Sequence, residues 1–320
     1  MFRMGTDERM SNDLAGAERT RLQGFGGHSM VAPLKRVIVQ RPAPPANVDD
    51  WRAYGYTNPV DHAATEAEFD AFCALLAGAG VDVVLQEPDD TGRLDSIFVY
   101  DASIVTDEGA ILTNPGKEIR RVEVDYAESL YNNLGVPVIG RITGDAILEG
   151  GDVFWLADTF LAVGIGYRTN QIGADQLSTF VRPQGVEVIR TELPHWHGPA
   201  ECLHLLSLIS PVAERTAVVF SPLVSTPFMQ LLNALEWNLI DIPAEEFATQ
   251  GTNVLALAPG KVLILEENVG TRRLLEAAGM EVLTYRGLHL SHNRQGGPTC
   301  LTRALWRDTA PPTGTLEGGG

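Results

Sequence analysis

The chain has 320 residues, of which 44% are hydrophobic and 20% are charged, and its formal net charge is −17. This composition is typical of a globular protein with one large core or two ordinary ones. An acidic surface repels phosphate backbones and anionic lipid heads, so we expect no nucleic acid and no membrane partner. No apolar run approaches the roughly 20 residues of a membrane helix, and the N-terminus lacks the apolar stretch of a secretion signal, which predicts a cytoplasmic location.

The two ends of the chain differ from the part between them. Residues 1–24 are polar without apolar periodicity, and residues 308–320 are rich in Pro, Gly and Thr. Both segments are predicted to be disordered. No low-complexity linker interrupts residues 25–307, which we expect to form a single domain.

One pattern recurs five times between these ends: a helical stretch runs into Gly or Asn, and an apolar strand follows at once. The junctions are at Gly80, Gly135, Gly185, Asn238 and Gly279. Gly, or a short polar Asn, suits the left-handed conformation that often ends a helix. Each junction therefore predicts a helix followed by a strand.

Two short strand-like runs joined by a turn precede most of these helices. Examples are residues 152–164, with a turn at Ala157-Asp158, and residues 252–267, with a turn at Pro259-Gly260. The repeating unit is strand, strand, helix, strand, about 40 to 55 residues long, which indicates radial or stacked repetition. A doubly wound parallel sheet would have one strand per helix, so the paired strands favour a repeated α/β module.

The three cysteines are Cys73, Cys202 and Cys300, and no two of them form a CxxC pair. A disulfide framework or a thiolate zinc site is therefore not expected. Cys73 lies in a helical pattern and Cys202 beside an apolar run, so both are predicted to be small buried hydrophobes. Cys300 follows two glycines and a proline in GGPTCLT, where a loop can present it in a cleft. It is the candidate nucleophile, although inert core cysteines are more common.

His204 lies in the strand-like stretch 202–206, which is mostly apolar. A core histidine is the simplest interpretation. The alternative is the proton shuttle that a cysteine nucleophile requires. The His195-Trp196-His197 triplet has no third ligand at a useful spacing, so we expect no metal site.

Two segments combine carboxylates with apolar or glycine residues. Residues 95–101, DSIFVYD, read as an apolar strand with an acid at each end, and residues 149–152, EGGD, place two acids around paired glycines where a strand begins. A planar guanidinium has five N–H donors, so carboxylates are suited to holding it in front of a nucleophile. Solvated turns are the alternative.

Taken together, these residues resemble the guanidine-modifying, or amidinotransferase, superfamily, and most closely its dimethylarginine dimethylaminohydrolases. The resemblance covers nearly all of residues 30–306. It is carried by six motifs in order: DSIFVYD at 95–101, PGKEIRR at 115–121, EGGD at 149–152, YRTN at 167–170, LHL at 203–205 and GGPTCLT at 296–302.

The resemblance implies an α/β fold of the pentein type, a fivefold pseudosymmetric α/β propeller of ββαβ modules in which the terminal strand completes the first module. It implies a small-molecule guanidino substrate and neither a metal nor an organic cofactor. It leaves a homodimer open.

The same resemblance implies a reaction. Cys300 would attack the guanidinium carbon, His204 would act as general acid and base, and Glu149 would steady His204 or the guanidinium. A covalent thiouronium-type intermediate would then be hydrolysed to a citrulline-like product.

The remaining matched positions concern substrate binding. Asp101 matches the carboxylate that binds the guanidinium, and Phe98 matches a wall of the pocket. Arg120 and Arg168 match positions that bind the substrate's α-carboxylate, with Asp95 orienting them.

Three departures bear on the substrate. Dimethylarginine hydrolases commonly carry Glu where this chain has Tyr100. Arginine deiminases and amidinotransferases carry an acid where this chain has Leu206, which favours the dimethylarginine branch. The segment 43–61 is longer than expected and is interpreted either as a lid or as surface decoration.

The leading hypothesis is therefore a hydrolase that converts arginine or N-methylated arginine to citrulline plus ammonia or an amine. The alternatives with related chemistry are an arginine deiminase, an arginine dihydrolase or an amidinotransferase. The alternative of a different class is a non-catalytic guanidine-binding protein.

Overall fold

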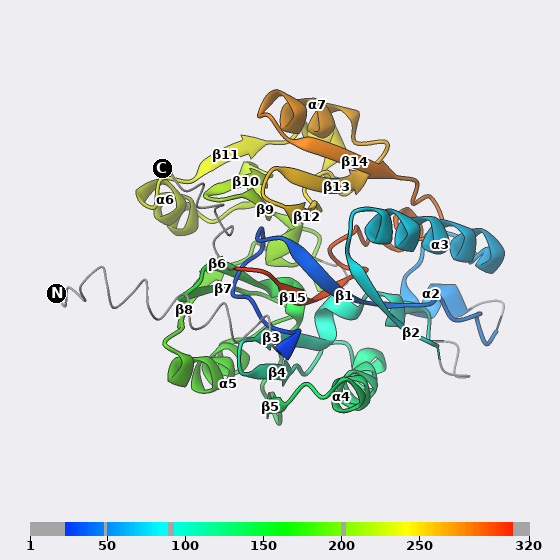
Figure 1. Cartoon of the computed structure of the whole chain (residues 1–320), viewed down its shortest axis with the longest axis horizontal. Helices are drawn as coiled ribbons and strands as arrows, with labels where there is room; N and C mark the ends of the chain where they lie inside the picture. The colour runs from blue at the N-terminus through cyan, green and yellow to red at the C-terminus, as the bar shows by residue number, and fades with distance from the viewer. Residues whose placement is uncertain (1–22, 48–49, 89–92, 200–202, 310–320) are drawn as a thin grey trace, which may run out of the picture.

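The computed structural model describes residues 23–47, 50–88, 93–199 and 203–309. Within them, five three-stranded sheets are arranged around a common axis (Figure 1). Cys202 lies outside the described residues, as do residues 1–22 of the predicted N-terminal arm and residues 310–320 of the predicted tail.

Every sheet has the same construction: an inner strand antiparallel to a middle strand, which is parallel to an outer strand reached through a helix. The first module consists of β15 (Arg303–Arg307), β1 (Leu34–Gln40), α3 (His62–Gly78) and β2 (Asp82–Gln86). The second consists of β3 (Ser103–Thr106), β4 (Gly109–Leu112), α4 (Glu123–Leu134) and β5 (Val138–Arg141). The third consists of β6 (Val153–Ala157), β7 (Phe160–Ile165), α5 (Gln171–Val181) and β8 (Glu187–Glu192). The fourth consists of β9 (Ile209–Ala213), β10 (Thr216–Val219), α6 (Thr226–Ala234) and β11 (Asn238–Asp241). The fifth consists of β12 (Leu255–Ala258), β13 (Lys261–Leu265), α7 (Val269–Ala277) and β14 (Glu281–Tyr285).

The predicted ββαβ repeat is therefore present in all five modules. The strand nearest the C-terminus, β15, pairs with β1 and completes the first module, as expected. The inner strands β15, β3, β6, β9 and β12 occupy equivalent positions, so the loops that precede them meet at one end of the axis.

Four of the five predicted junctions take the left-handed conformation. Gly80, Gly135, Gly185 and Gly279 have φ angles of 84°, 70°, 76° and 86°. At the fourth junction the prediction for Asn238 is wrong, because Asn238 already begins β11 and Glu236, with φ 58°, makes the turn.

Two segments predicted as strands are short 3₁₀ turns instead. Residues 95–101 fall in two such turns, Leu94–Ile97 and Val99–Ala102, whose N–H groups bond to carbonyls three residues earlier. His204 directly precedes a third turn, Leu205–Ser207. The backbone N–H of Ser207 donates to the carbonyl of His204, and the Ser207 hydroxyl oxygen accepts the backbone N–H of His204 at 3.1 Å. Both segments therefore lie outside the sheets, directly before the inner strands β3 and β9.

The helices pack on the outer side of the sheets. In the first module, Phe69, Phe72 and Leu76 of α3 are buried against Val37 and Val39 of β1. Burial of this apolar area stabilises each module. Cys73 is half-buried in the same cluster, which agrees in part with its predicted role as a small buried hydrophobe.

In the described ranges, we find no helix of the length and apolar character needed to cross a membrane.

Candidate active site

The five loops that precede the inner strands are joined to one another in a closed ring of hydrogen bonds. The bonds link Gly151 N to Asp101 Oδ1 (2.9 Å), Leu205 N to Asp152 Oδ1 (2.9 Å), Thr252 Oγ1 to Ser207 O (2.6 Å), Asn253 Nδ2 to Cys300 Sγ (3.1 Å) and Tyr100 N to Cys300 O (3.3 Å). Residues that lie up to 200 positions apart in the chain are thereby brought to one end of the axis. The predicted residues Cys300, His204, Glu149 and Asp101 all lie in this ring or next to it.

Asp101 is buried where the second and third modules meet. Its Oδ1 accepts the backbone N–H of Gly151, and its Oδ2 accepts Nη1 of Arg120 at 2.5 Å. Burial would raise the pKa of Asp101, but the positive charges around it, chiefly His204 and Arg120, hold that pKa well below its usual range. Asp101 is therefore an anion with its oxygens aimed into the ring.

Glu149 joins His204 to Arg168. Its Oε2 lies 2.7 Å from His204 Nε2, and its two oxygens accept a fork from Arg168, with Nε at 2.9 Å and Nη2 at 2.7 Å. Burial would raise the pKa of Glu149, yet Arg168 and His204 outweigh it, so that pKa is lowered. Since an ionised Glu149 only accepts hydrogen bonds, His204 Nε2 carries a hydrogen and Nδ1 is directed into the ring.

The EGGD motif has a steric reason. A side chain at position 151 would collide with His204 Nδ1 and would reach within 3.0 Å of Asp101 Oδ1, and one at position 150 would collide with the carbonyl of Tyr100. Only glycine lets the backbone pass between the acid and the imidazole. One carboxylate oxygen of Asp101, one of Glu149 and one ring nitrogen of His204 consequently lie within 4.8 Å of one another.

Cys300 is held by Asn253, a residue that the sequence analysis did not single out. The Asn253 side chain donates Nδ2 to Cys300 Sγ and accepts the backbone N–H of Thr299 at 3.0 Å, so it grips the cysteine loop at two points. The two glycines of GGPTCLT fit this arrangement, because a side chain at Gly297 would collide with Asn253 and one at Gly296 with Phe98. Phe98 thus packs on the cysteine loop.

Arg120 is fully engaged by carboxylates and carbonyls. Besides Asp101, it bonds to Glu123 through Nε at 3.1 Å and Nη2 at 2.8 Å, and to the carbonyl of Phe98 at 2.9 Å. Its guanidinium lies directly against the acid for which a substrate guanidinium was predicted.

The Asp95 carboxylate faces other cations than the two arginines that the resemblance implied. It pairs with Arg294, at 3.0 Å from Nε, and lies 3.9 Å from Lys117 Nζ, and only the Asp95 carbonyl approaches Arg120, at 3.4 Å. The predicted role of Asp95 in orienting Arg120 thus has one contact, through the Asp95 carbonyl, and its role toward Arg168 stays a prediction. Asp95 follows β2 in the chain and Arg294 precedes β15. They come together because β15 pairs with β1 in the same sheet.

The segment 43–61 packs beside this pair. Tyr56 donates its hydroxyl to the carbonyl of Leu94 at 2.9 Å, and Thr57 N bonds to the carbonyl of Asn293. Tyr54, from the short helix α2 (Asp50–Tyr54), is buried in one cluster with Tyr56 and Leu94. The described part of the segment thus covers the loops that carry Asp95 and Arg294.

Among the described residues, Asp101, Glu149 and His204 are the group whose geometry could hold a metal ion. Both carboxylates are already neutralised, by Arg120 and Arg168 respectively. Two guanidinium groups in this position repel a divalent cation, so the donor set does not suit a metal, whereas both carboxylates are already paired with planar guanidinium groups.

Asn253 and Arg294 are residues of this region that the sequence analysis did not single out, and Asp152, which it noted in EGGD, received no role there. A usable signal was present, because each module carries polar residues shortly before its inner strand: Asp101, Asp152, His204, Asn253 and Cys300. Aligning the five repeats on their inner strands would have selected Asn253 and Asp152.

A family model for arginine deiminase matches residues 95–228 and 222–307, which is more than half of the chain and includes every residue of the ring. The chain belongs to the arginine deiminase family. It is 30% identical over 274 residues to N(G),N(G)-dimethylarginine dimethylaminohydrolase of Streptomyces coelicolor, covering 85% of this chain and 98% of that protein. It is 33% identical over 193 residues to arginine deiminase of Rhodococcus opacus, covering 51% and 47%.

Solved structures share the fold of this chain. A dimethylarginine dimethylaminohydrolase from Pseudomonas aeruginosa, complexed with citrulline, has a TM-score of 0.68 at 22% identity, over 84% of this chain and 98% of that one. The N-terminal domain of ArgZ, a cyanobacterial arginine dihydrolase, has a TM-score of 0.71 at 16% identity, over 86% and 99%. At these identities the likeness concerns the fold, and it confirms the fivefold α/β propeller of ββαβ modules. The resemblance to the guanidine-modifying superfamily is confirmed as well.

Proposed function

We propose that this chain hydrolyses a guanidino compound, arginine or an N-methylated arginine, to citrulline and ammonia or an amine, with Cys300 as the nucleophile. The family and the relatives named above support this reaction, since they include both dimethylarginine hydrolases and arginine deiminases.

One observation carries the proposal. Two acids of the site already pair with guanidinium groups of the chain itself, because Asp101 holds the Arg120 guanidinium and Glu149 holds the Arg168 guanidinium in a two-point fork. Both acids are buried, so each contact is strengthened by the low local dielectric. A substrate guanidinium that takes the place of Arg120 on Asp101 would lie beside His204 and in the loop ring that contains Cys300.

The first half of the reaction forms a covalent bond. The Cys300 thiol transfers its proton to His204 Nδ1, and the thiolate attacks the guanidinium carbon, which Asp101 holds in a fixed plane. The C–N bond to the leaving nitrogen breaks, and that nitrogen takes the proton from His204 and departs as ammonia or an amine. A thiouronium-type group remains on the sulfur.

The second half releases the product. His204 takes a proton from a water molecule, which attacks the same carbon, and the C–S bond then breaks to regenerate the Cys300 thiol. The product is a ureido compound. Glu149 keeps the His204 ring oriented throughout and stabilises its protonated form.

The residue before Asp101 bears on the substrate. Tyr100 occupies the position where dimethylarginine hydrolases commonly carry Glu, and its side chain turns away from the ring toward Met30 and the carbonyl of Val153. The Tyr100 side chain therefore offers no second carboxylate to the guanidinium. The position of Tyr100 does not distinguish unmethylated from methylated arginine. A substrate screen decides between them.

The deciding experiment uses Cys300→Ser with Cys73→Ser as the matched control. Cys300→Ser should abolish release of citrulline while circular dichroism and substrate binding by calorimetry stay close to wild type. Cys73→Ser, a change at the half-buried cysteine of α3, should keep activity. Undiminished turnover in Cys300→Ser would refute the assignment.

Product analysis by mass spectrometry separates the rivals. Citrulline from arginine or methylarginine supports the hydrolase, whereas ornithine indicates a dihydrolase and a new guanidino compound indicates an amidinotransferase. Binding without any product, together with slow alkylation of Cys300, would indicate a guanidine-binding protein. The homodimer and the cytoplasmic location stay predictions.

A further inference from the structure

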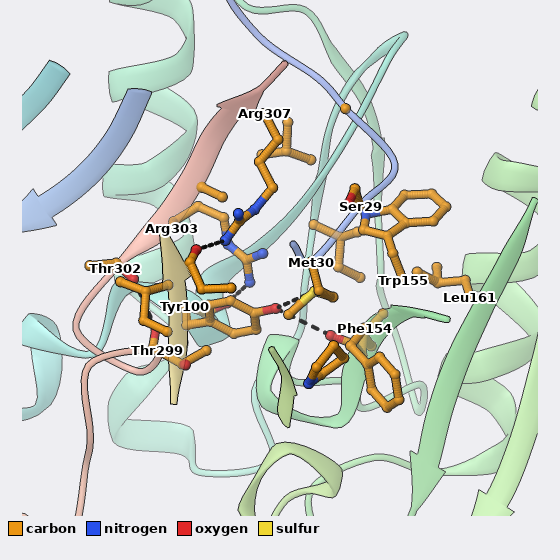
Figure 2. A pocket seen from close by; sticks show the side chains of 18 of the residues that line it. Ser29, Met30, Tyr100, Phe154, Trp155, Leu161, Thr299, Thr302, Arg303 and Arg307 are labelled. Carbon is orange, nitrogen blue, oxygen red and sulfur yellow. Dashed lines mark hydrogen bonds between the residues drawn. The ribbon is translucent and has the colours of Figure 1, made fainter. Parts of the chain in front are cut away.

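A cavity of about 30 Å³ lies on the axis of the propeller, among the inner strands (Figure 2). All five inner strands line it, with Val105, Val153, Pro211, Leu255 and Arg303 as one example from each. The segment that precedes β1 closes the end away from the loop ring, since residues 26, 27, 29 and 30 also line the cavity. The cavity is therefore separate from the candidate active site.

Two buried guanidinium groups face this cavity. Arg303 and Arg307 are 6% and 3% exposed and stand at the two ends of β15, on the same face of that strand. Arg303 lies over the Tyr100 ring at 3.6 Å and donates to the Tyr100 carbonyl, as Figure 2 shows. Arg307 donates to the carbonyls of Ala32, at 2.7 Å, and Ala256, at 2.9 Å. All of these partners are neutral.

The positive charge of the pair is not balanced within the described residues. None of the residues that line the cavity is Asp or Glu, and no described carboxylate lies within ion-pair distance of Arg303 or Arg307. Arg303 Nε is buried and has no hydrogen-bond partner in the described part of the chain. Burial lowers the pKa of Arg307 to about 10, as expected for a cation without a counter-charge.

Buried charges in proteins are normally paired, because an unpaired ion in a poorly polarisable interior is strongly destabilising. Water in the cavity could accept the Arg303 Nε–H but would leave both charges uncompensated. A cavity of this size holds about two water-sized occupants. Phosphate and the carboxylates of metabolites have too many heavy atoms to fit.

We propose that the axial cavity binds one small monoatomic anion, chloride under ordinary conditions, which accepts the Nε–H of Arg303 and is attracted by the charge of Arg307. This site is independent of the reaction proposed above, because none of its contacts involves the substrate. It adjoins the loop ring through Tyr100, whose carbonyl accepts from Arg303 and whose N–H donates to the carbonyl of Cys300. An anion bound to Arg303 would therefore stabilise the loop ring through the contact between Arg303 and Tyr100.

The test is thermal unfolding of the full chain in sodium chloride and in sodium gluconate at equal ionic strength. Chloride should raise Tm in a saturable manner, on the order of 2–5 °C, whereas gluconate is too large to enter. Arg303→Met, which keeps an apolar stem but removes the charge, should lose the chloride-specific rise. Arg190→Met is the matched control, because Arg190 is exposed and pairs with Asp175 on the surface, and it should keep the rise.

A second measurement decides the matter if Arg303→Met does not fold. Crystals of the wild-type chain grown in sodium bromide should show an anomalous peak within hydrogen-bond distance of Arg303 Nε. Identical Tm values in chloride and gluconate for the wild type, or a cavity without an anomalous peak, would overturn the proposal.

Discussion

The side-chain amide of Asn253 donates a hydrogen bond to the sulfur of Cys300 at 3.1 Å, from a different module of the propeller. A donor aimed at sulfur stabilises the thiolate more than the thiol. Asn253 is therefore expected to position Cys300 and to increase the fraction of reactive thiolate at neutral pH, although it does not touch the substrate.

Asn253→Asp tests this relationship. Aspartate keeps the oxygen that accepts the Thr299 N–H but replaces the donor with a negative charge. We expect the pH profile of Cys300 alkylation by iodoacetamide to move up by about one pH unit, and kcat/KM at pH 7 to fall by about tenfold. A purely structural role would lower the fraction of folded protein without moving the profile. Asn233→Asp, at an exposed position of α6, is the control and should behave as wild type.

The repeat and the junction glycines could be predicted from the sequence because they obey local rules. Gly80, Gly135 and Gly279 adopt left-handed angles that other residues rarely tolerate, so the helix ends are encoded in single residues. At the fourth junction Glu236 makes the turn in place of Asn238, because α6 already ends at Ala234 and Asn238 belongs to β11.

The contacts of the site followed a different logic. Cys300 and the acids could be recognised as residue types, but their partners lie in other modules. Asn253 donates a hydrogen bond to Cys300, and Arg294, from the loop before Cys300, forms an ion pair with Asp95. Such pairs depend on how the five loops meet at the axis. Local sequence patterns do not predict these contacts between modules. The strand prediction at 95–101 failed for the same reason, since the segment has no strand beside it to pair with.

Glu149 and His204 form the second relationship open to test. Glu149→Gln keeps a polar group near His204 but removes the charge that orients the ring and stabilises its protonated form. We expect kcat to fall by about 10²- to 10³-fold with a smaller change in KM, measured by citrulline release. Glu128→Gln, which removes a surface partner of Arg141, should leave both constants unchanged. A loss confined to KM would mean that Glu149 binds substrate and does not assist proton transfer.

Asp152 predicts an unusual pH dependence of stability. Burial raises the pKa of Asp152 from 3.8 to about 6, while its Oδ1 accepts the N–H of Leu205. Between these values the folded state holds more protons than the unfolded state, so the free energy of unfolding falls as pH rises from about 4 to 6. The difference between 3.8 and about 6 corresponds to roughly 3 kcal/mol, which wild type loses by pH 7.5.

Asp152→Asn should remove this dependence while keeping an acceptor for Leu205. Urea unfolding at pH 4 and pH 7.5 should show the variant gaining about 3 kcal/mol relative to wild type at the higher pH. Asp145→Asn, at an exposed position, is the control. Parallel stabilities of wild type and Asp152→Asn at the two values would show that Asp152 ionises normally.

The binding of the substrate's α-carboxylate gives the last prediction. Arg168 is matched to this role, yet its guanidinium also forks onto Glu149, so removing it disturbs the ring for every substrate. A carboxylate role must therefore appear as an additional loss for substrates that carry a carboxylate. We expect Arg168→Ala to raise KM for arginine by about 10- to 100-fold and KM for agmatine, which lacks the carboxylate, by much less. Arg190→Ala is a matched surface control. Equal losses for both substrates would show that Arg168 serves Glu149 alone and would leave Lys117, 30% exposed beside Asp95, as the cation to test next.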